Sequence, residues 1–166
     1  MKKIIAAILF VISTSAAAGF LDLYNGVTLG LPLPEHDFQY LSPPLATKNT
    51  PLLLIDFWAT WCEPCRVSIP KLNALQQKFS PQGLQIIGIS QETKTEVLPF
   101  LARIPMHYPT AVEGKLNLHK ALGVKALPYA IFVDKKGIII WRGQPSEIND
   151  ELIEELLIKQ KALGER

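Results

Sequence analysis

The sequence predicts a single α/β domain in which a central β-sheet is covered by helices. Residues 52–58 form a short apolar run, the pattern of a strand that is buried on both faces. A helical pattern follows this run directly, and strand and helix patterns then alternate along the rest of the chain. The length of 166 residues is enough for one domain with a substantial core.

The first predicted helix follows the strand at 52–58 and is ended by residues 80–83, which read Ser-Pro-Gln-Gly. Its apolar residues recur at spacings of three and four, which places them on one face: Cys65, Ile69, Leu72, Leu75 and Phe79. Pro70 lies inside this helix and predicts a kink, because proline cannot donate the backbone hydrogen bond. A second strand is expected at 84–90, followed by a helix at 93–103.

The later part of the chain predicts a short helix at 116–122, closed by Gly123, and then a β-hairpin. The hairpin strands are expected at 129–133 and 138–141, joined by a turn that contains Gly137. A last helix at 148–163 has acidic residues at its start and lysines near its end, as the helix dipole prefers. Residues 19–51 contain five prolines, which leave room only for short edge strands near 36–41.

The composition excludes several classes of protein. A formal net charge of +2 is too small for a protein that binds nucleic acid through a strongly basic face. Two cysteines cannot form the dense disulfide framework of a small secreted module. Hydrophobic residues make up 48% of the chain, so an intrinsically disordered protein is not expected either.

Residues 1–18 have the pattern of a secretory signal peptide, which leaves residues 19–166 as the expected mature domain. Lys2 and Lys3 precede the apolar run at 4–12, and small residues end at Ala18, after which we expect cleavage. The apolar run is shorter than the roughly 20 residues that span a bilayer, although an uncleaved N-terminal anchor is the alternative. Because both lysines would be removed, the mature chain would carry 15 basic and 15 acidic residues. A periplasmic or otherwise exported location would place both cysteines in an oxidising compartment.

The two cysteines form a C-x-x-C motif, Cys62 and Cys65, where the first strand meets the first helix. A helix start offers unpaired N–H groups and the positive end of the helix dipole, which favour the thiolate at Cys62. These positions suggest an attacking role for Cys62 and a resolving role for Cys65, which should be the less exposed of the two. A purely stabilising disulfide is the weaker interpretation, because closing so short a loop removes little chain entropy. A structural zinc site needs four ligands, and the three histidines are scattered and expected on the surface or in loops.

Two segments carry a family resemblance. The first is LIDFWATWCEPCR at 54–66, with Pro70 five residues beyond the second cysteine. The second is GVKALPYAIFVDKKG at 123–137. Together they resemble the exported TlpA/ResA-like branch of the thioredoxin-like proteins, which includes reductants used in cytochrome c maturation, and the resemblance covers roughly residues 30–160. It implies a thioredoxin-like fold with a central mixed sheet and helices on both faces.

The resemblance implies catalytic roles for Cys62, Cys65, Pro128 and Asp56. Cys62 and Cys65 match the nucleophilic and resolving cysteines. Pro128 matches a cis-proline that lies against the disulfide, where the preceding residue offers backbone hydrogen bonds to an extended substrate. That residue is commonly small, hydroxylated or β-branched in the family, so Leu127 departs from the pattern and leaves the substrate preference open. Asp56 matches the buried acid of thioredoxin, which should have a raised pKa and could relay a proton to or from Cys65.

Residues beside the cysteines are expected to form the substrate surface. Trp61, Glu63 and Pro64 are candidate substrate-binding residues together with Leu127, whereas Trp58 is expected to pack in the core. The charge of Glu63, next to the first cysteine, would oppose a very low thiol pKa, which disfavours a strongly oxidising enzyme.

These observations predict an exported thiol:disulfide oxidoreductase that acts as a reductant on disulfides in partner proteins. They require no bound cofactor or metal, imply an upstream thiol electron donor that could be membrane-bound, and leave the oligomeric state open. One alternative is a copper metallochaperone that binds the metal through Cys62, Cys65 and a histidine such as His107. Another is a non-catalytic module that holds extended peptide near Pro128. A peroxidase is a weaker alternative, since that pattern places threonine three residues before the cysteine and Thr60 is only two before.

Overall fold

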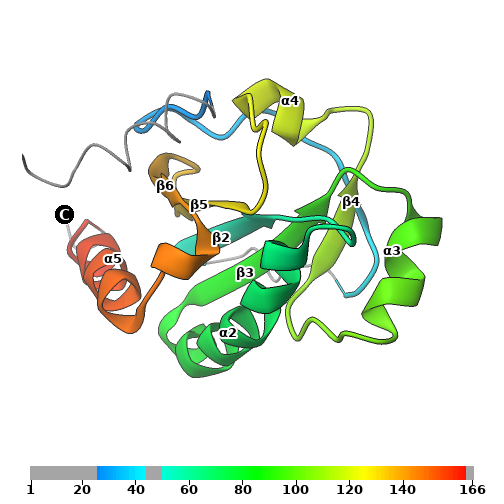
Figure 1. Cartoon of the computed structure of the whole chain (residues 1–166). Helices are drawn as coiled ribbons and strands as arrows, with labels where there is room; N and C mark the ends of the chain where they lie inside the picture. Colours follow the sequence, from blue (N-terminus) through cyan, green and yellow to red (C-terminus); the bar gives the residue numbers. More distant parts are fainter. Residues whose placement is uncertain (1–25, 44–49, 164–166) are drawn as a thin grey trace, which may run out of the picture.

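A computed structural model describes residues 26–43 and 50–163, which build one six-stranded sheet with helices packed against it (Figure 1). The strands are β1 (Phe38–Tyr40), β2 (Leu52–Phe57), β3 (Leu84–Ser90), β4 (Thr110–Glu113), β5 (Tyr129–Asp134) and β6 (Ile139–Gly143). Their order in the sheet is β1-β4-β3-β2-β5-β6. Strands β2, β3 and β4 are parallel, whereas β1, β5 and β6 each pair antiparallel with a neighbour. The sheet is therefore mixed, as the family resemblance implied.

Helices cover both faces of this sheet. They are α2 (Glu63–Phe79), α3 (Lys94–Leu101), α4 (Leu118–Leu122) and α5 (Asp150–Ala162), with the 3-10 helices η1 (Ser80–Gln82) and η2 (Pro145–Glu147). Alternate residues of β2 point to opposite faces. Leu52 and Leu54 pack in one core cluster with α2 and α5, whereas Ile55 and Phe57 pack in another with α4. Helix α3 lies with α2, because Val97 and Phe100 share a third cluster with residues of α2.

The elements with strong periodicity form as predicted. All five residues assigned to one face of α2 are buried, Pro70 lies inside that helix, and β3 spans the predicted residues 84–90. Gly83 and Gly123 adopt left-handed conformations, with φ of 106° and 64°, and so end η1 and α4. Helix α5 begins at Asp150 because the side chain of Asn149 accepts a hydrogen bond from the N–H of Leu152.

Strand β4 and the short helix η2 were not predicted. Strand β4 has only four residues and follows Pro105 and Pro109, so its local pattern is too short to identify a strand. It is buried because it pairs with β3 on one side and with the edge strand β1 on the other. The edge strand expected near 36–41 is confirmed by β1.

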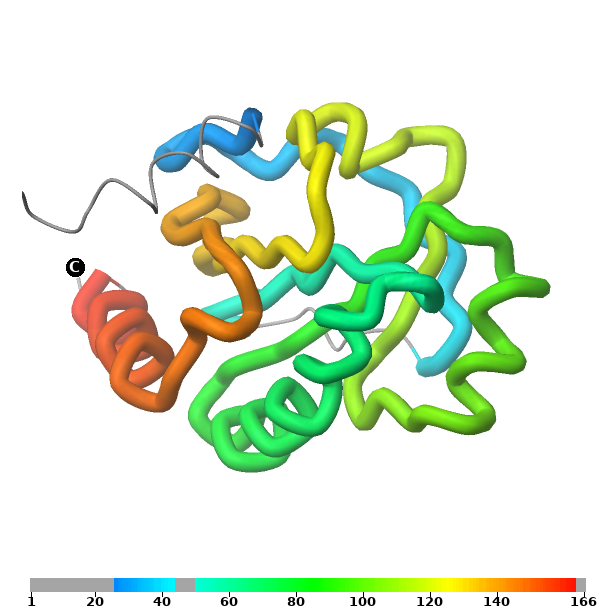
Figure 2. Tube along the Cα trace, viewed as in Figure 1, coloured from blue at the N-terminus to red at the C-terminus, as the bar shows by residue number. Residues whose placement is uncertain are grey.

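The first described residues run along α4 and the edge strand β6 (Figure 2). The N–H of Gly26 donates to the carbonyl of Gly123 at 3.0 Å, and Pro32 forms an isolated bridge with Ile138. The predicted signal peptide at 1–18 lies outside the described residues. Within 26–43 and 50–163, no helix is long and apolar enough to cross a bilayer.

Candidate active site

A disulfide joins Cys62 and Cys65 at the first turn of α2, with the sulfurs 2.00 Å apart. Cys62 is the N-cap of the helix, and its Sγ accepts a hydrogen bond from the N–H of Cys65 at 3.3 Å. Pro64 suits the first turn because its missing N–H would have no helical partner there, and Glu63 complements the positive end of the dipole. The first cysteine thus occupies the helix start that the sequence predicted.

The expected difference in exposure between the two cysteines is nearly absent. Cys62 is 4% exposed and Cys65 is 3% exposed, because both pack with Trp58 and Ile69 in one cluster. The two tryptophans differ as predicted, since Trp58 is fully buried and Trp61 is 72% exposed. Trp61 is therefore available to a partner, whereas the sulfurs of the oxidised state are shielded.

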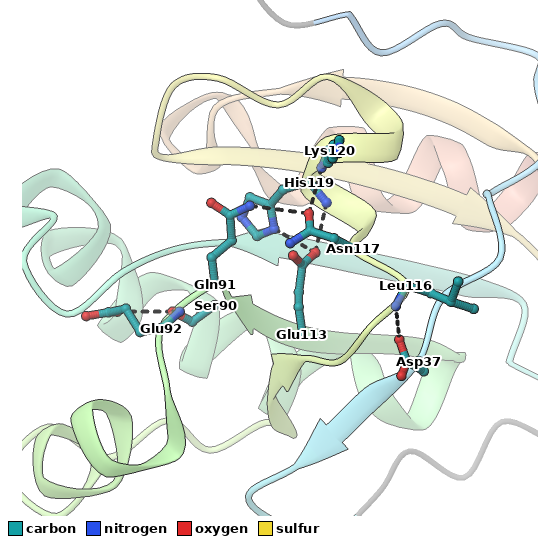
Figure 3. Close-up of polar contacts among 9 residues, drawn as sticks. All are labelled: Asp37, Ser90, Gln91, Glu92, Glu113, Leu116, Asn117, His119 and Lys120. Atoms are coloured by element: carbon teal, nitrogen blue, oxygen red, sulfur yellow. Dashed lines mark hydrogen bonds and ion pairs between the residues drawn. The ribbon is translucent and has the colours of Figure 1, made fainter.

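The loop ahead of Cys62 is fixed by Glu92, which follows the end of β3. One carboxylate oxygen of Glu92 accepts the N–H of Thr60 at 2.7 Å, and the other accepts the Thr60 hydroxyl at 2.5 Å. Ser90 donates its hydroxyl to the same carboxylate at 3.0 Å (Figure 3). Three hydrogen bonds to one charged group therefore tie the approach to Cys62 to the neighbouring strand.

Asp56 is buried in β2 on the face that α2 covers. It alternates with Ile55 along the strand and is 3% exposed. Burial raises the pKa of Asp56 to about 7, and the hydrogen bond from the Tyr108 hydroxyl, 3.4 Å from Oδ2, partly offsets this rise. The hydrogen-bond donor that contacts the Asp56 carboxyl group is therefore a tyrosine side chain. A carboxyl group that titrates near neutral pH on the face carrying Cys65 can accept and return a proton.

The Leu127-Pro128 peptide bond is cis, and Pro128 borders a groove of about 420 Å³ at the start of α2. The groove is lined by Glu63, Pro64, Val67, Ser68, Pro128 and Ser146. The structure thus brings together three of the residues predicted for the site, Glu63, Pro64 and Pro128. Leu127 is not part of the lining; its side chain is partly buried and packs against two core clusters. Trp61 also lies outside the lining.

The prediction that all three histidines lie on the surface or in loops is wrong for His119. His36 and His107 are exposed, but His119 lies in α4 and is 2% exposed. The cause is that the buried face of this short helix comprises Leu118, His119 and Leu122, so the histidine points into the molecule. Within the described part of the chain, no group of three or more histidine, cysteine, aspartate or glutamate side chains is placed to hold a metal ion.

Sequence reasoning missed Tyr108, Glu92 and Ser146. Tyr108 and Ser146 come from distant segments, and no local pattern marks them as neighbours of Asp56 or of the groove. Glu92 had a usable signal, because β2 and β3 are parallel and the carboxyl ends of parallel strands meet at one edge of a sheet. An acidic residue two positions after β3 is therefore expected near the residues that follow β2.

Residues 42–142 match the AhpC/TSA family. The chain belongs to this family. Among its relatives is thiol-disulfide oxidoreductase ResA of Bacillus thuringiensis subsp. konkukian, 30% identical over 105 residues. The match covers 63% of this chain and 61% of the relative, so this AhpC/TSA protein spans about three fifths of the length of that relative.

Solved structures confirm the thioredoxin-like fold of this AhpC/TSA protein. One, from Chlorobium tepidum, is assigned as a thiol:disulfide interchange protein DsbE and is 25% identical, with a TM-score of 0.65 over 81% of this chain and 98% of that one. Another is the thioredoxin domain of a thiol-disulfide oxidoreductase from Bacteroides vulgatus, 19% identical, with a TM-score of 0.65 over 79% and 99% of the two chains. The resemblance stated from the sequence is therefore confirmed for family and fold.

Proposed function

We propose that this chain is an exported thiol:disulfide oxidoreductase that reduces disulfides in partner proteins. The observation that carries the proposal is the Cys62–Cys65 disulfide at the start of α2, beside a groove bordered by Pro128. A buried acid with a pKa near 7, Asp56, lies on the same face of the sheet. The names of the similar proteins, thiol-disulfide oxidoreductase and thiol:disulfide interchange protein, agree with this chemistry.

The reaction begins from the reduced dithiol. The thiolate of Cys62 attacks one sulfur of the partner's disulfide, forming a mixed disulfide and releasing the partner's other sulfur as a thiolate. The thiolate of Cys65 then attacks Cys62, which releases the second sulfur of the partner and forms the Cys62–Cys65 disulfide. The partner gains two electrons, and the enzyme is left in the oxidised state that the structure describes.

Asp56 serves as the proton acceptor in the second step. Its carboxylate takes the proton of the Cys65 thiol, so that Cys65 attacks as a thiolate, and the proton is passed to the departing thiolate of the partner. A group with a pKa near 7 is suited to both directions of transfer at neutral pH.

The substrate binds in the groove that Pro64 and Pro128 line, and the backbone of Leu127, next to Pro128, offers it hydrogen bonds. Trp61, which is 72% exposed, extends this surface beyond the disulfide. The exposed charge of Glu63 beside the first cysteine disfavours the thiolate of the reduced form, which supports the reducing direction. An upstream thiol donor, membrane-bound or soluble, restores the dithiol, and cytochrome c maturation is one pathway that such a reductant would serve.

The experiment that tests this proposal is insulin reduction by the purified domain with a dithiol as the electron source. We expect the wild type to be active and Cys62→Ser to be inactive, whereas Cys65→Ser should accumulate mixed disulfides with its partners. The identity of the trapped partners would name the substrate. Full activity of Cys62→Ser would contradict the mechanism, and an inactive wild type would favour a non-catalytic binding module.

The direction of the reaction is tested separately by the reduction potential of the Cys62–Cys65 pair. Proteins with this motif span about −270 to −120 mV, from reductant to oxidant. We expect a value in the lower half of that range. A potential near the oxidising end would contradict the assignment as a reductant.

A further inference from the structure

Glu113 and His119 form a buried polar pair close to the end of β2. Glu113 is the last residue of β4, His119 is the second residue of α4, and both side chains are 3% exposed. Oε1 of Glu113 accepts hydrogen bonds from the backbone N–H and from Nδ1 of His119, each at 2.8 Å (Figure 3). One carboxylate oxygen therefore fixes both the start of the helix and the orientation of the imidazole ring.

This pair is an unfavourable choice for stability alone. Among the described residues, Oε2 of Glu113 and Nε2 of His119 are buried without a hydrogen-bond partner. Burying polar atoms in this way opposes folding, and replacing a buried pair by apolar side chains of similar volume is often neutral or stabilising. Where such a pair is kept, one role is to select a single arrangement of the surrounding elements.

The pair contacts both segments that lead to the active site. The rings of His119 and Phe57 meet edge to face, with centroids 4.6 Å apart, and Phe57 is the last residue of the strand that leads to Cys62. The carbonyl of His119 accepts the N–H of Val124 at 2.8 Å, at the start of the loop that leads to Pro128. A shift of His119 would therefore move this loop relative to the end of β2.

The start of α4 is also held by a residue that follows β3. Asn117 caps the helix through the N–H of Lys120, and Gln91, which follows β3, donates to the same Asn117 oxygen at 3.3 Å (Figure 3). At the other end of the loop, Leu127 packs against the cluster that contains both cysteines. Helix α4 and the loop at 123–128 thus form a continuous connection from the Glu113–His119 pair to the disulfide.

We propose that Glu113 and His119 are positioning residues that hold the loop at 123–128, and with it Pro128, in the arrangement that binds a protein substrate. The proposal rests on the proposed function for its effect on activity. It predicts that the pair sets the affinity for an extended protein substrate and leaves the disulfide chemistry itself unchanged.

The test compares three variants with the wild type. The double variant Glu113→Met/His119→Leu fills the same space with apolar groups and removes the hydrogen bonds. His119→Asn retains an amide N–H close to the position of Nδ1, so it should restore the bond to Glu113. His36→Leu removes an exposed histidine and serves as the matched control.

We expect the double variant to raise KM for insulin about tenfold, as loss of a positioning contact does. Its rate with a small aromatic disulfide and its reduction potential should stay at the wild-type values, because neither substituted residue lies in the C-x-x-C motif. Exchange of the Val124 amide hydrogen should become about tenfold faster. Its hydrogen bond to the backbone carbonyl of residue 119 would open more often once the side chain at that position is no longer held by Glu113. His119→Asn and His36→Leu should resemble the wild type in all four measurements.

An unchanged KM for insulin in a folded double variant would overturn the proposal, as would equal losses with insulin and the small disulfide. If the wild type does not reduce insulin, the proposed function fails, and exchange at Val124 still decides whether the pair holds the loop. If the double variant does not fold, His119→Gln replaces it, because its longer side chain moves the N–H away from Glu113. Equal KM and Val124 exchange in His119→Gln and His119→Asn would then overturn the proposal.

Discussion

Asp56 should make the stability of the oxidised protein fall as the pH rises from about 4 to about 7. Burial raises the pKa of Asp56 to about 7, whereas an aspartate in an unfolded chain has a pKa of about 3.9. Between these values the folded protein holds a proton that the unfolded chain has lost. Unfolding then releases a proton, so a higher pH favours the unfolded state. Below about pH 4, Asp56 is protonated in both the folded and the unfolded state, so it no longer lowers the stability.

The size of the effect follows from the two pKa values. They differ by about three units, and each unit corresponds to about 1.4 kcal/mol, so the free energy of unfolding loses about 4 kcal/mol across this pH range. That is a large part of the roughly 5–15 kcal/mol that stabilises a typical domain. Asparagine does not ionise, so the substitution Asp56→Asn should remove this contribution. Any change in the contact with Tyr108 is the same at every pH and cancels when two pH values are compared.

The measurement is urea unfolding of the oxidised wild type and of Asp56→Asn at pH 4 and pH 8. The cysteines do not titrate while they form a disulfide, which keeps their ionisation out of the comparison. The stability of the variant relative to the wild type should increase by about 4 kcal/mol between the two pH values. Glu35→Gln is the control, because Glu35 is exposed. Its free energy of unfolding should differ from that of the wild type by nearly the same amount at both pH values. If the free energy of unfolding of Asp56→Asn also differed from that of the wild type by the same amount at both pH values, the raised pKa of Asp56 and the role proposed for this residue would be refuted.

Three further predictions concern neighbouring residues. Tyr108→Phe removes the hydrogen bond that lowers the pKa of Asp56, so a carboxyl NMR titration should show that pKa rising above about 7; no rise would contradict the contact. Trp58→Ala should destabilise the protein by about 3–5 kcal/mol in urea unfolding, because this side chain is fully buried. Trp61→Ala should change stability by less than about 0.5 kcal/mol, and similar losses for the two would contradict their placement. Glu63→Gln removes a negative charge beside the Cys62 thiolate, so it should raise the reduction potential by on the order of 10 mV. The potential is measured by equilibration with glutathione, and an unchanged or lower value would contradict this charge effect.

The elements that the sequence located well are those whose buried face repeats within one segment. In α2, the five apolar residues of one face recur at helical spacing and are all buried: Cys65, Ile69, Leu72, Leu75 and Phe79. Strand β3 is a largely apolar run that follows Gly83, and its ends agree with the prediction. Strand β4 offers no such signal, because what makes it a strand is its pairing with β3 and β1, which lie far away in the chain.

The same distinction holds for the candidate site. The two cysteines lie in one short motif, and the cis peptide bond at Pro128, implied by the family resemblance, is confirmed. The partner of Asp56 is 52 residues away in sequence, and the partner of Thr60 is 32 residues away. Hydrogen bonds over such separations depend on the packing of the whole sheet, so residue patterns could identify the acid but not the tyrosine that contacts it.

The last two residues of β2 each adjoin a buried polar group, one on each face of the sheet. Asp56 meets Tyr108 on the face of α2, and Phe57 meets the Glu113–His119 pair on the face of α4. Ionised Asp56 and the unpaired atoms of Glu113 and His119 both oppose folding, and both groups adjoin the strand end from which the loop to the disulfide begins. Proteins depart from the most stable local choice chiefly at functional sites. Apolar replacement of Glu113 and His119 should therefore maintain or raise stability while it weakens substrate binding; lower stability with unchanged binding would show that the pair serves the fold alone.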